Sequence, residues 1–281
     1  MRIFSDIYDL QEHLNKLRKN GKSIGFVPTM GALHNGHISL IKSSITENDI
    51  TVCSIFVNPT QFNNSADLQN YPRTMNADIE LLDSINCDLV FTPTVEAMYP
   101  KPETEILFNF GTIELVMEGK DRPGHFQGVG TIVKKLFDIV EPNNAYFGKK
   151  DYQQLLIIKE LTRQYNLSPN IIGCEIIREN DGLAMSSRNT RLTKHQRDEA
   201  PFIRKTMLWA KENIENYSPN NLTKEVENRI NSNSEMRITY FEISEANTLI
   251  KCENWESNTD YIGFIVVEMG DVRLIDNIEL F

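Results

Sequence analysis

The chain has 281 residues, of which 40% are hydrophobic and 24% charged, and its 29 basic and 39 acidic residues give a formal net charge of −10 at pH 7. This acidic balance argues against a general nucleic-acid-binding protein, which presents a basic patch or domain. The longest apolar runs, such as residues 262–267, are far shorter than the roughly 18 residues of a membrane span. The N-terminus has no signal-peptide features, and four widely spaced cysteines predict reduced thiols in a cytoplasmic protein.

Short apolar strands alternate with helices in the first 176 residues. In chain order the predicted elements are a helix at 5–20, a strand at 24–27, a helix from about 37, a strand at 50–57, a helix at 76–85, a strand at 88–91, a helix at 129–140, a strand at 145–147, a helix at 152–165 and a strand at 171–177. Because these strands are continuous apolar runs, we expect a parallel sheet covered on both faces. Right-handed crossovers make it a Rossmann-like, doubly wound sheet with its ligand crevice at the carboxyl ends of the strands.

The pattern changes near residue 177. A polar loop at 178–191 leads to a helix capped by Thr193, with Gln196 three residues later. A helix at 222–231 and strands at 238–243, 262–267 and 272–275 follow, and residues 269–271 predict a hairpin turn. The sequence therefore predicts an α/β domain at 1–176 and a smaller C-terminal α+β domain at 177–281.

The first chemical motif is PTMGALHNGH at residues 28–37, between a strand and a helix. Gly31 permits close backbone approach, and the helix start presents free N–H groups and a positive dipole end. His34 and His37 are three residues apart, so both can face one anion, such as a nucleotide phosphate. The alternatives are a loop with two ordinary histidines or part of a metal site, but no Glu follows the first His as in HExxH.

The second motif, FGKKDYQQ at residues 147–154, again leads from a strand into a helix. Lys150 can place a point charge on a phosphate, and Asp151 can accept from ribose hydroxyls. Asp151 with Gln154 also has the spacing of a plain capping box.

Two weaker signals accompany these motifs. In DGLAMSSRN at residues 181–189, two hydroxyls and a guanidinium can form an oxyanion clamp for pyrophosphate, although the composition also suits a linker. Gln61 and Gln154 offer donors and acceptors for a hydroxy acid. Arg122 and His125 precede a helix and are either a further part of the site or a turn with a cap.

The motifs together resemble the pantoate–β-alanine ligase family. The resemblance rests on PTMGALHNGH, VNPTQF, YPRT, FTPTVEAMYP, RPGHFQGVGTIVKKLF, FGKKDYQQL and DGLAMSSRN, in this order, and it continues weakly through GDVRLIDN. HNGH resembles the HxGH signature of the wider nucleotidylyltransferase superfamily, and MSSR resembles its KMSKS-like element.

The resemblance implies a two-step reaction with ATP. The carboxylate of pantoate attacks the α-phosphate of ATP, which gives pantoyl adenylate and pyrophosphate. The amine of β-alanine then attacks the adenylate, which gives pantothenate and AMP. The resemblance further implies Mg²⁺ on the phosphates, a homodimer, and a second domain that acts as a lid over the adenylate.

Site residues follow from the same match. Catalytic roles fall to a set of cations and hydroxyls around the phosphates: His34, His37, Lys150, Ser186, Ser187 and Arg188. ATP binding adds to these Met30, Gly31, Gly148, Lys149, Asp151, Ile177 and Met185. Pantoate binding falls to Pro28, Met30, Gln61 and Gln154.

The chain departs from the family at two places. Some members carry consecutive acidic residues near a magnesium site after YPRT, whereas this chain has Ala77 and only Asp78, which is the single candidate metal ligand. The loop at 63–67 lacks the Gly-Pro and Glu-Asp residues that are frequent in the family. The alternative functions are a nucleotidylyltransferase acting on another small acid or alcohol and a nucleotide-binding protein whose catalytic site has decayed.

Overall fold

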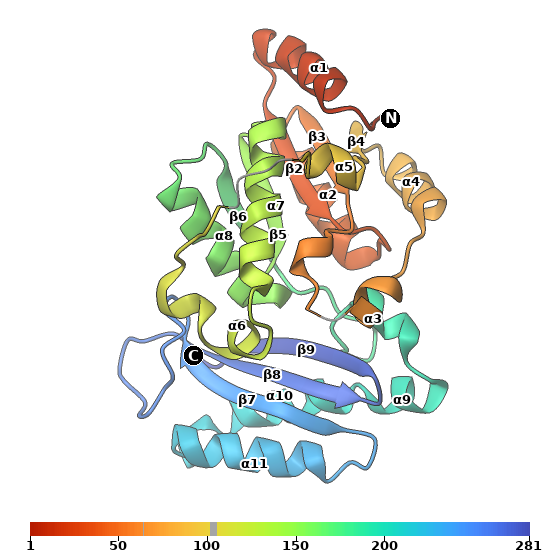
Figure 1. The fold of residues 1–281 in the computed structure, drawn as a ribbon. Helices are drawn as coiled ribbons and strands as arrows, with labels where there is room; N and C mark the ends of the chain where they lie inside the picture. The colour runs from red at the N-terminus through yellow and green to blue at the C-terminus, as the bar shows by residue number, and fades with distance from the viewer. Residues whose placement is uncertain (64, 102–105) are drawn as a thin grey trace. The chain divides into compact units, whose positions relative to one another are not determined.

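The computed structural model describes residues 1–63, 65–101 and 106–281; Asn64, in the divergent loop at 63–67, lies outside them. The chain forms two compact units. The first contains residues 1–149 and 153–175, and the second contains residues 150–152 and 176–281. Figure 1 labels most of the helices and strands along the chain.

The first unit is built on a six-stranded parallel sheet in the order β1-β4-β3-β2-β5-β6. Its strands are β1 (Arg2–Phe4), β2 (Ile24–Thr29), β3 (Ile50–Ile55), β4 (Leu89–Phe91), β5 (Asn144–Gly148) and β6 (Asn170–Cys174). From β2 the chain builds outward to β3 and β4, and then returns to place β5 on the other side of β2. This reversal is the switch point at which doubly wound sheets bind ligands.

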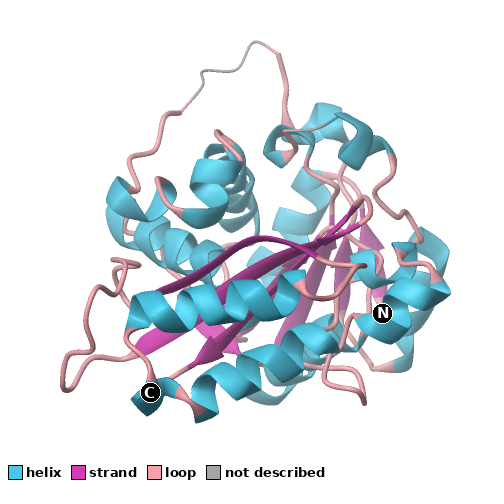
Figure 2. Ribbon diagram, turned by 90° about the horizontal axis from the view of Figure 1, so that it is seen from below, coloured by secondary structure: helices cyan, strands magenta, loops and turns pink. Residues whose placement is uncertain are grey.

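Helices cover both faces of this sheet, as the predicted parallel sheet requires (Figures 1 and 2). The long helices are α1 (Ile7–Lys19), α2 (Asn35–Glu47), α4 (Met75–Ser84), α7 (His125–Val140) and α8 (Tyr152–Gln164). Successive strand residues point to opposite faces: Phe26 packs in the cluster with α1, α7 and α8, whereas Val27 packs with α2 and α4. The α/β prediction is confirmed, with a Rossmann-like sheet.

Shorter elements of the first unit lie mostly in the connections after the strands. They are η1 (Pro59–Gln61), α3 (Ser65–Gln69), α5 (Val95–Met98), η2 (Gly111–Glu114) and α6 (Met117–Asp121). The turn η3 (Lys149–Asp151) begins in the first unit, and its last two residues belong to the second. The sequence predicted neither these short turns nor β1. Helix α7 also begins four residues earlier than expected, at His125.

The second unit is a three-stranded antiparallel sheet in the order β7-β8-β9, with helices packed against it. Its elements are η4 (Ser187–Arg191), α9 (Lys194–Glu199), α10 (Phe202–Glu212), η5 (Ile214–Asn216), α11 (Pro219–Asn231), β7 (Arg237–Glu245), β8 (Tyr261–Met269) and β9 (Val272–Glu279). The Thr193 capping box and the β8–β9 hairpin, with Gly270 at φ +58°, form as predicted. The helix after Thr193 ends at Glu199, and α10 begins after Pro201 as a separate helix.

Candidate functional site

The loop between β2 and α2 begins at the switch point of the sheet. The pairing of Gly25 with Asn144 and of Phe26 with Ala145 brings the ends of β2 and β5 to the same edge. Gly31 has φ +80°, and a Cβ there would lie 3.0 Å from Ile55 and 3.1 Å from Asp78. Glycine therefore lets this loop turn sharply against β3 and α4.

The two predicted histidines form a reciprocal cap at the start of α2. Nδ1 of His34 accepts from the backbone N–H of Gly36 at 3.1 Å, and Nδ1 of His37 accepts from the backbone N–H of His34 at 3.3 Å. The ring centroids are 4.1 Å apart. Because each Nδ1 accepts a hydrogen bond, a neutral ring carries its proton on Nε2. The cap thus makes both Nε2 atoms donors beside the positive end of a helix, where an anion binds favourably.

Asp78 fixes this loop from helix α4. It is 3% exposed, and its two carboxylate oxygens accept from the backbone N–H groups of Ala32 at 2.9 Å and Leu33 at 2.8 Å. The hydroxyl of Thr74 donates to the same carboxylate at 3.1 Å. Through these hydrogen bonds Asp78 fixes the backbone segment that precedes His34.

A second cluster forms around Gln61, at the end of η1 after β3. Its side-chain nitrogen lies 3.2 Å from Sδ of Met30, so the structure brings two of the predicted pantoate residues together. Asn58 donates to Oε1 of Gln61 at 3.1 Å and accepts from the hydroxyl of Tyr99 at 2.6 Å. The sequence prediction included VNPTQF but assigned no role to Asn58 or Tyr99.

Arg122 and His125 contact the backbone of Gln61. Nδ1 of His125 lies 2.8 Å from the carbonyl oxygen of Gln61, and Nη2 of Arg122 donates to the same oxygen at 3.4 Å. Nη1 of Arg122 lies 3.2 Å from Nε2 of His125 and 3.6 Å from the carboxylate of Glu118. His125 is therefore a donor through Nδ1 and an acceptor through Nε2, the reverse of His34 and His37.

The two adjacent glutamines of α8 have different surroundings. Gln153 is buried and bonds the backbone of η2 and α6: its amide donates to Ile113 and Val116, and its oxygen accepts from Glu118. Gln154, the residue predicted to bind pantoate, is half-buried. In the same unit, Lys149 follows Gly148 at the end of β5 and forms an ion pair with Glu175.

The remaining predicted ATP residues belong to the second unit. Lys150 and Ser186 line a small pocket with Asn189 and Asp276. Ser186 caps η4, which begins at Ser187 and contains Arg188, by accepting from the backbone N–H of Arg188 at 3.2 Å. The backbone N–H of Met185 donates to the carbonyl oxygen of Ile177 at 3.0 Å. Asp151 is exposed, and its carboxylate lies 3.8 Å from Nζ of Lys150.

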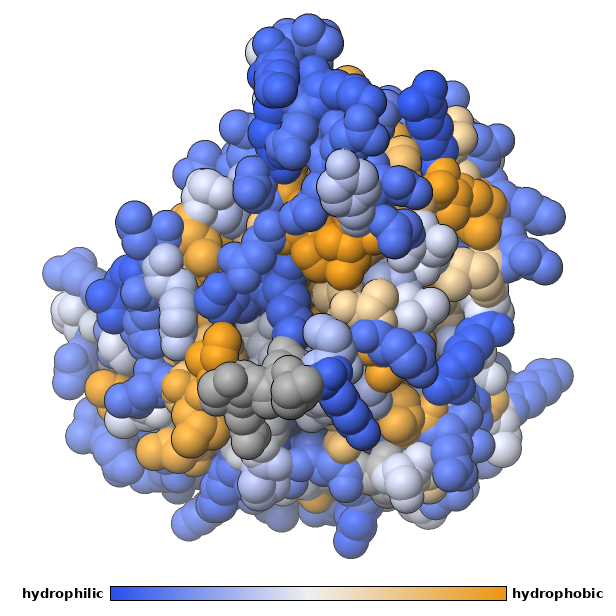
Figure 3. Space-filling model, turned by 45° about the horizontal axis from the view of Figure 1, so that its top comes forward, coloured by the Kyte–Doolittle hydropathy of each residue, from blue (hydrophilic) through white to orange (hydrophobic). Residues whose placement is uncertain are grey.

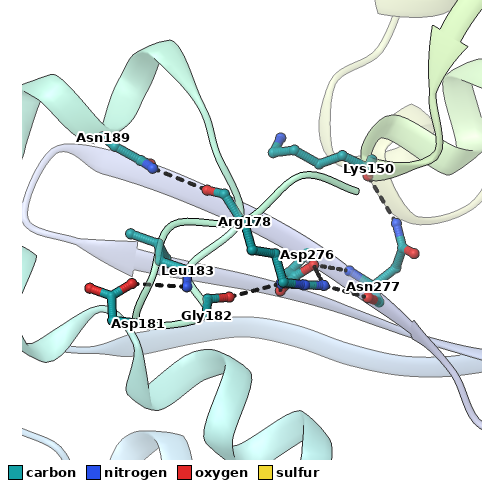
Figure 4. A network of polar contacts seen from close by, with 9 residues as sticks. Lys150, Arg178, Asp181, Gly182, Leu183, Asn189, Asp276 and Asn277 are labelled. Carbon is teal, nitrogen blue, oxygen red and sulfur yellow. Dashed lines mark hydrogen bonds and ion pairs between the residues drawn. The ribbon is translucent and has the colours of Figure 1, made fainter. Parts of the chain in front are cut away.

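A polar network lies beside this pocket (Figure 4). Arg178 binds the carboxylate of Asp276 through both terminal nitrogens, at 2.7 and 2.9 Å. Burial lowers the pKa of Arg204, Arg178 lowers it further, and Asp276 opposes both effects. One carboxylate therefore offsets two neighbouring guanidinium groups.

Among the described residues, the side chains do not assemble a ligand set for a metal ion. In the part of the chain that the structure describes, no group of three or more His, Cys, Asp and Glu side chains could hold one, and the oxygens of Asp78 bind backbone N–H groups. None of the described helices combines the length and apolar character needed to cross a bilayer.

Comparison with known proteins identifies the chain. The family model for pantoate–β-alanine ligase matches residues 2–279. Pantothenate synthetases of Bacteroides fragilis and Flavobacterium psychrophilum are 49% and 48% identical, with at least 99% of each chain covered. Among solved structures, the pantothenate synthetase of Thermus thermophilus has a TM-score of 0.92 at 37% identity and full coverage of both chains.

A second solved structure was determined with ligands. The pantoate–β-alanine ligase of Francisella tularensis, complexed with beta-gamma ATP and beta-alanine, has a TM-score of 0.84 at 40% identity, and the match covers 100% of this chain and 98% of that one. The chain belongs to the pantoate–β-alanine ligase family.

Proposed function

We propose that the residue sets described above carry out the two halves of a pantoate–β-alanine ligase reaction. In the first half, the carboxylate of pantoate displaces pyrophosphate from the α-phosphorus of ATP and forms pantoyl adenylate. In the second, the amine of β-alanine displaces AMP and forms pantothenate. The attacking carboxylate is ionised at neutral pH and needs no general base, so the protein contributes orientation and charge stabilisation.

The observation that carries this proposal is the reciprocal cap of His34 and His37. It makes Nε2 of both rings hydrogen-bond donors at a helix N-terminus, next to the switch point of the sheet. We assign these donors to the phosphates of ATP. Lys150, Ser186, Ser187 and Arg188 would bind the departing pyrophosphate, since a cation, two hydroxyls and a guanidinium suit its oxygens.

Adenosine and pantoate take the remaining predicted residues. We assign adenosine to Gly31, Gly148, Lys149, Asp151, Ile177 and Met185. The pairing of Gln61 with Met30 supports a pantoate site, in which Pro28 and Gln154 also take part. An amide donor and acceptor beside an apolar thioether suit a branched hydroxy acid.

Mg²⁺ would bind together with ATP, as a complex with its phosphates. Mg²⁺ retains several waters and is held largely by substrate phosphates, which agrees with the lack of a protein ligand cluster among the described residues. No step above depends on a protein-bound metal.

The test is pyrophosphate release from Mg·ATP with pantoate, before and after β-alanine is added. A single-turnover burst with pantoate alone, followed by steady formation of AMP and pantothenate with β-alanine, is the expected result. Sustained release that ignores β-alanine would favour the alternative nucleotidylyltransferase. No release in either condition would exclude the proposed reaction.

We also propose a homodimer in the cytoplasm. Figure 3 shows hydrophobic side chains in several patches on one face. In the single chain Leu107 and Leu115 are 78% and 67% exposed, and a second copy of the chain that packed on them would remove them from water. Light scattering coupled to size exclusion measures the oligomeric state.

For the compartment, the support comes from the cysteines. Burial raises the pKa of the thiols of Cys53 and Cys87, that of Cys87 to about 12, so these cysteines resist oxidation and stay reduced.

A further inference from the structure

The backbone of Lys150 is held by a residue of the last strand. The side-chain amide of Asn277, on β9, donates to the carbonyl oxygen of Lys150 at 2.9 Å across a sequence separation of 127 residues (Figure 4). Asn277 is 6% exposed. Two residues after Lys150, the ring of Tyr152 contacts the ring of Phe264 on β8, at a centroid distance of 5.9 Å. Residues 150–152 therefore pack as part of the second unit.

The neighbouring residue of β9 holds the loop that carries Ser186. Asp276 binds Arg178 through both carboxylate oxygens, and one of them also accepts from the backbone N–H of Asn277 at 2.8 Å. Arg178 donates to the carbonyl of Gly182 at 3.1 Å, and it forms a backbone bridge with Ala184. Asp276 and Asn277, consecutive residues of β9, thus hold the loop that carries Ser186 and the segment that contains Lys150.

These two segments meet at one pocket. Lys150, Ser186, Asn189 and Asp276 all line it. The amide nitrogen of Asn189 donates to the carbonyl of Ala184 at 3.0 Å, whereas its buried Oδ1 has no hydrogen-bond partner among the described residues. The pocket therefore combines a cation, a hydroxyl and an unsatisfied acceptor on a support provided by β9.

We propose that Asn277 is a positioning residue for Lys150, and that Asp276 and Arg178 hold Asn277 in place. The proposal rests on the role of Lys150 in adenylation proposed above. A hydrogen bond to the carbonyl of Lys150 restricts its backbone and so the path along which its side chain reaches the nucleotide. The attraction of a point charge for a transition state depends on such preorganisation, and a displacement of about 1 Å can cost on the order of 100-fold in rate.

The test measures single-turnover pyrophosphate release with Asn277→Ala and Asn277→Asp. Alanine removes the donor. Aspartate has nearly the same shape, but its carboxylate cannot donate to the Lys150 carbonyl. Both variants remove the same hydrogen bond, so the test can be carried out if either of them folds. We expect release to slow by about 10- to 100-fold in both, with the KM for pantoate unchanged because Gln61 is untouched. Asn213→Ala is the matched control, since the Asn213 amide also donates to a backbone carbonyl in this unit, that of Trp209 at 2.9 Å; it should keep normal release.

A double-mutant cycle with Lys150→Ala separates positioning from a general structural role. If Asn277 acts through Lys150, Asn277→Ala slows release in the wild-type background and adds nothing in the Lys150→Ala background. Equal effects in both backgrounds, or normal release in both Asn277 variants while Lys150→Ala is impaired, would overturn the inference. Normal release in Lys150→Ala itself would instead refute the proposed role of the lysine.

Discussion

The imidazole of His34 caps helix α2 through Nδ1, and its Nε2 edge is the part that we assign to the phosphates of ATP. Asparagine is among the best N-cap residues, so His34→Asn retains an acceptor for the N–H of Gly36 while it removes the Nε2 donor and the ring contact with His37. We expect near-normal stability in urea unfolding and pyrophosphate release slowed by about 100-fold or more. His34→Ala should lose about 1 kcal/mol of stability in addition. Normal release in His34→Asn would exclude the ring from phosphate binding.

At the residue scale as well, His125 contacts the backbone of Gln61, a residue that we assign to pantoate. Its Nδ1 lies within hydrogen-bond distance of the Gln61 carbonyl, so His125→Phe keeps a ring in the buried position and removes the donor. One hydrogen bond contributes about 0.5–1.5 kcal/mol; we therefore expect the KM for pantoate to rise by about two- to tenfold, with the KM for ATP unchanged. His125→Asn, whose amide can replace Nδ1–H, should restore part of the loss. An equal rise of both KM values would argue against a role confined to pantoate.

Single residues show where prediction from sequence ends. The spacing of His34 and His37 indicated a helix start that binds an anion, and the capping geometry is consistent with that hypothesis. Asn58 and Tyr99 were not assigned because their hydrogen bond joins positions 41 residues apart. A periodic pattern contains no information about such a pair.

At the scale of elements, helix α4 supports the β2–α2 loop through one buried carboxylate. Asp78→Ala would leave the N–H groups of Ala32 and Leu33 without these acceptors, and an unsatisfied buried group costs about 1–3 kcal/mol. We expect the free energy of unfolding, measured in urea, to fall by about 2–4 kcal/mol. Asp83→Ala, on the exposed side of the same helix, should change it little. If Asp78 were instead a magnesium ligand, stability would hold and the Mg²⁺ concentration for half-maximal activity would rise.

The elements themselves were predictable in proportion to their length and apolar content. Strands β2, β3 and β5 are buried on both faces, so their sequences are continuous apolar runs that indicate a parallel sheet. Strand β1 has three residues, two of them exposed, and exists because it pairs with β4. Residues 2–4 alone have no periodicity from which to predict it.

At the scale of the whole molecule, the division into units follows long-range contacts. The sequence placed a boundary near residue 177, where composition changes, and the structure divides the chain between residues 175 and 176. It also groups residues 150–152 with the second unit, although they lie between β5 and the rest of α8. Asn277 and Phe264, more than 100 residues away, hold this segment, so no local pattern indicates its membership.

The distance between Lys150 and Asn277 along the chain has a consequence during protein synthesis. Ribosomes add about 5–20 residues per second, so the 127 residues between the two positions correspond to a delay of about 6–25 s. In that interval the nascent polypeptide already contains both capping histidines, but the donor for the carbonyl of Lys150 has not been made. An incomplete chain therefore contains the helix start that we assign to the phosphates before it contains the side chain that holds the backbone of Lys150, and we expect it not to consume ATP until β9 has been synthesised.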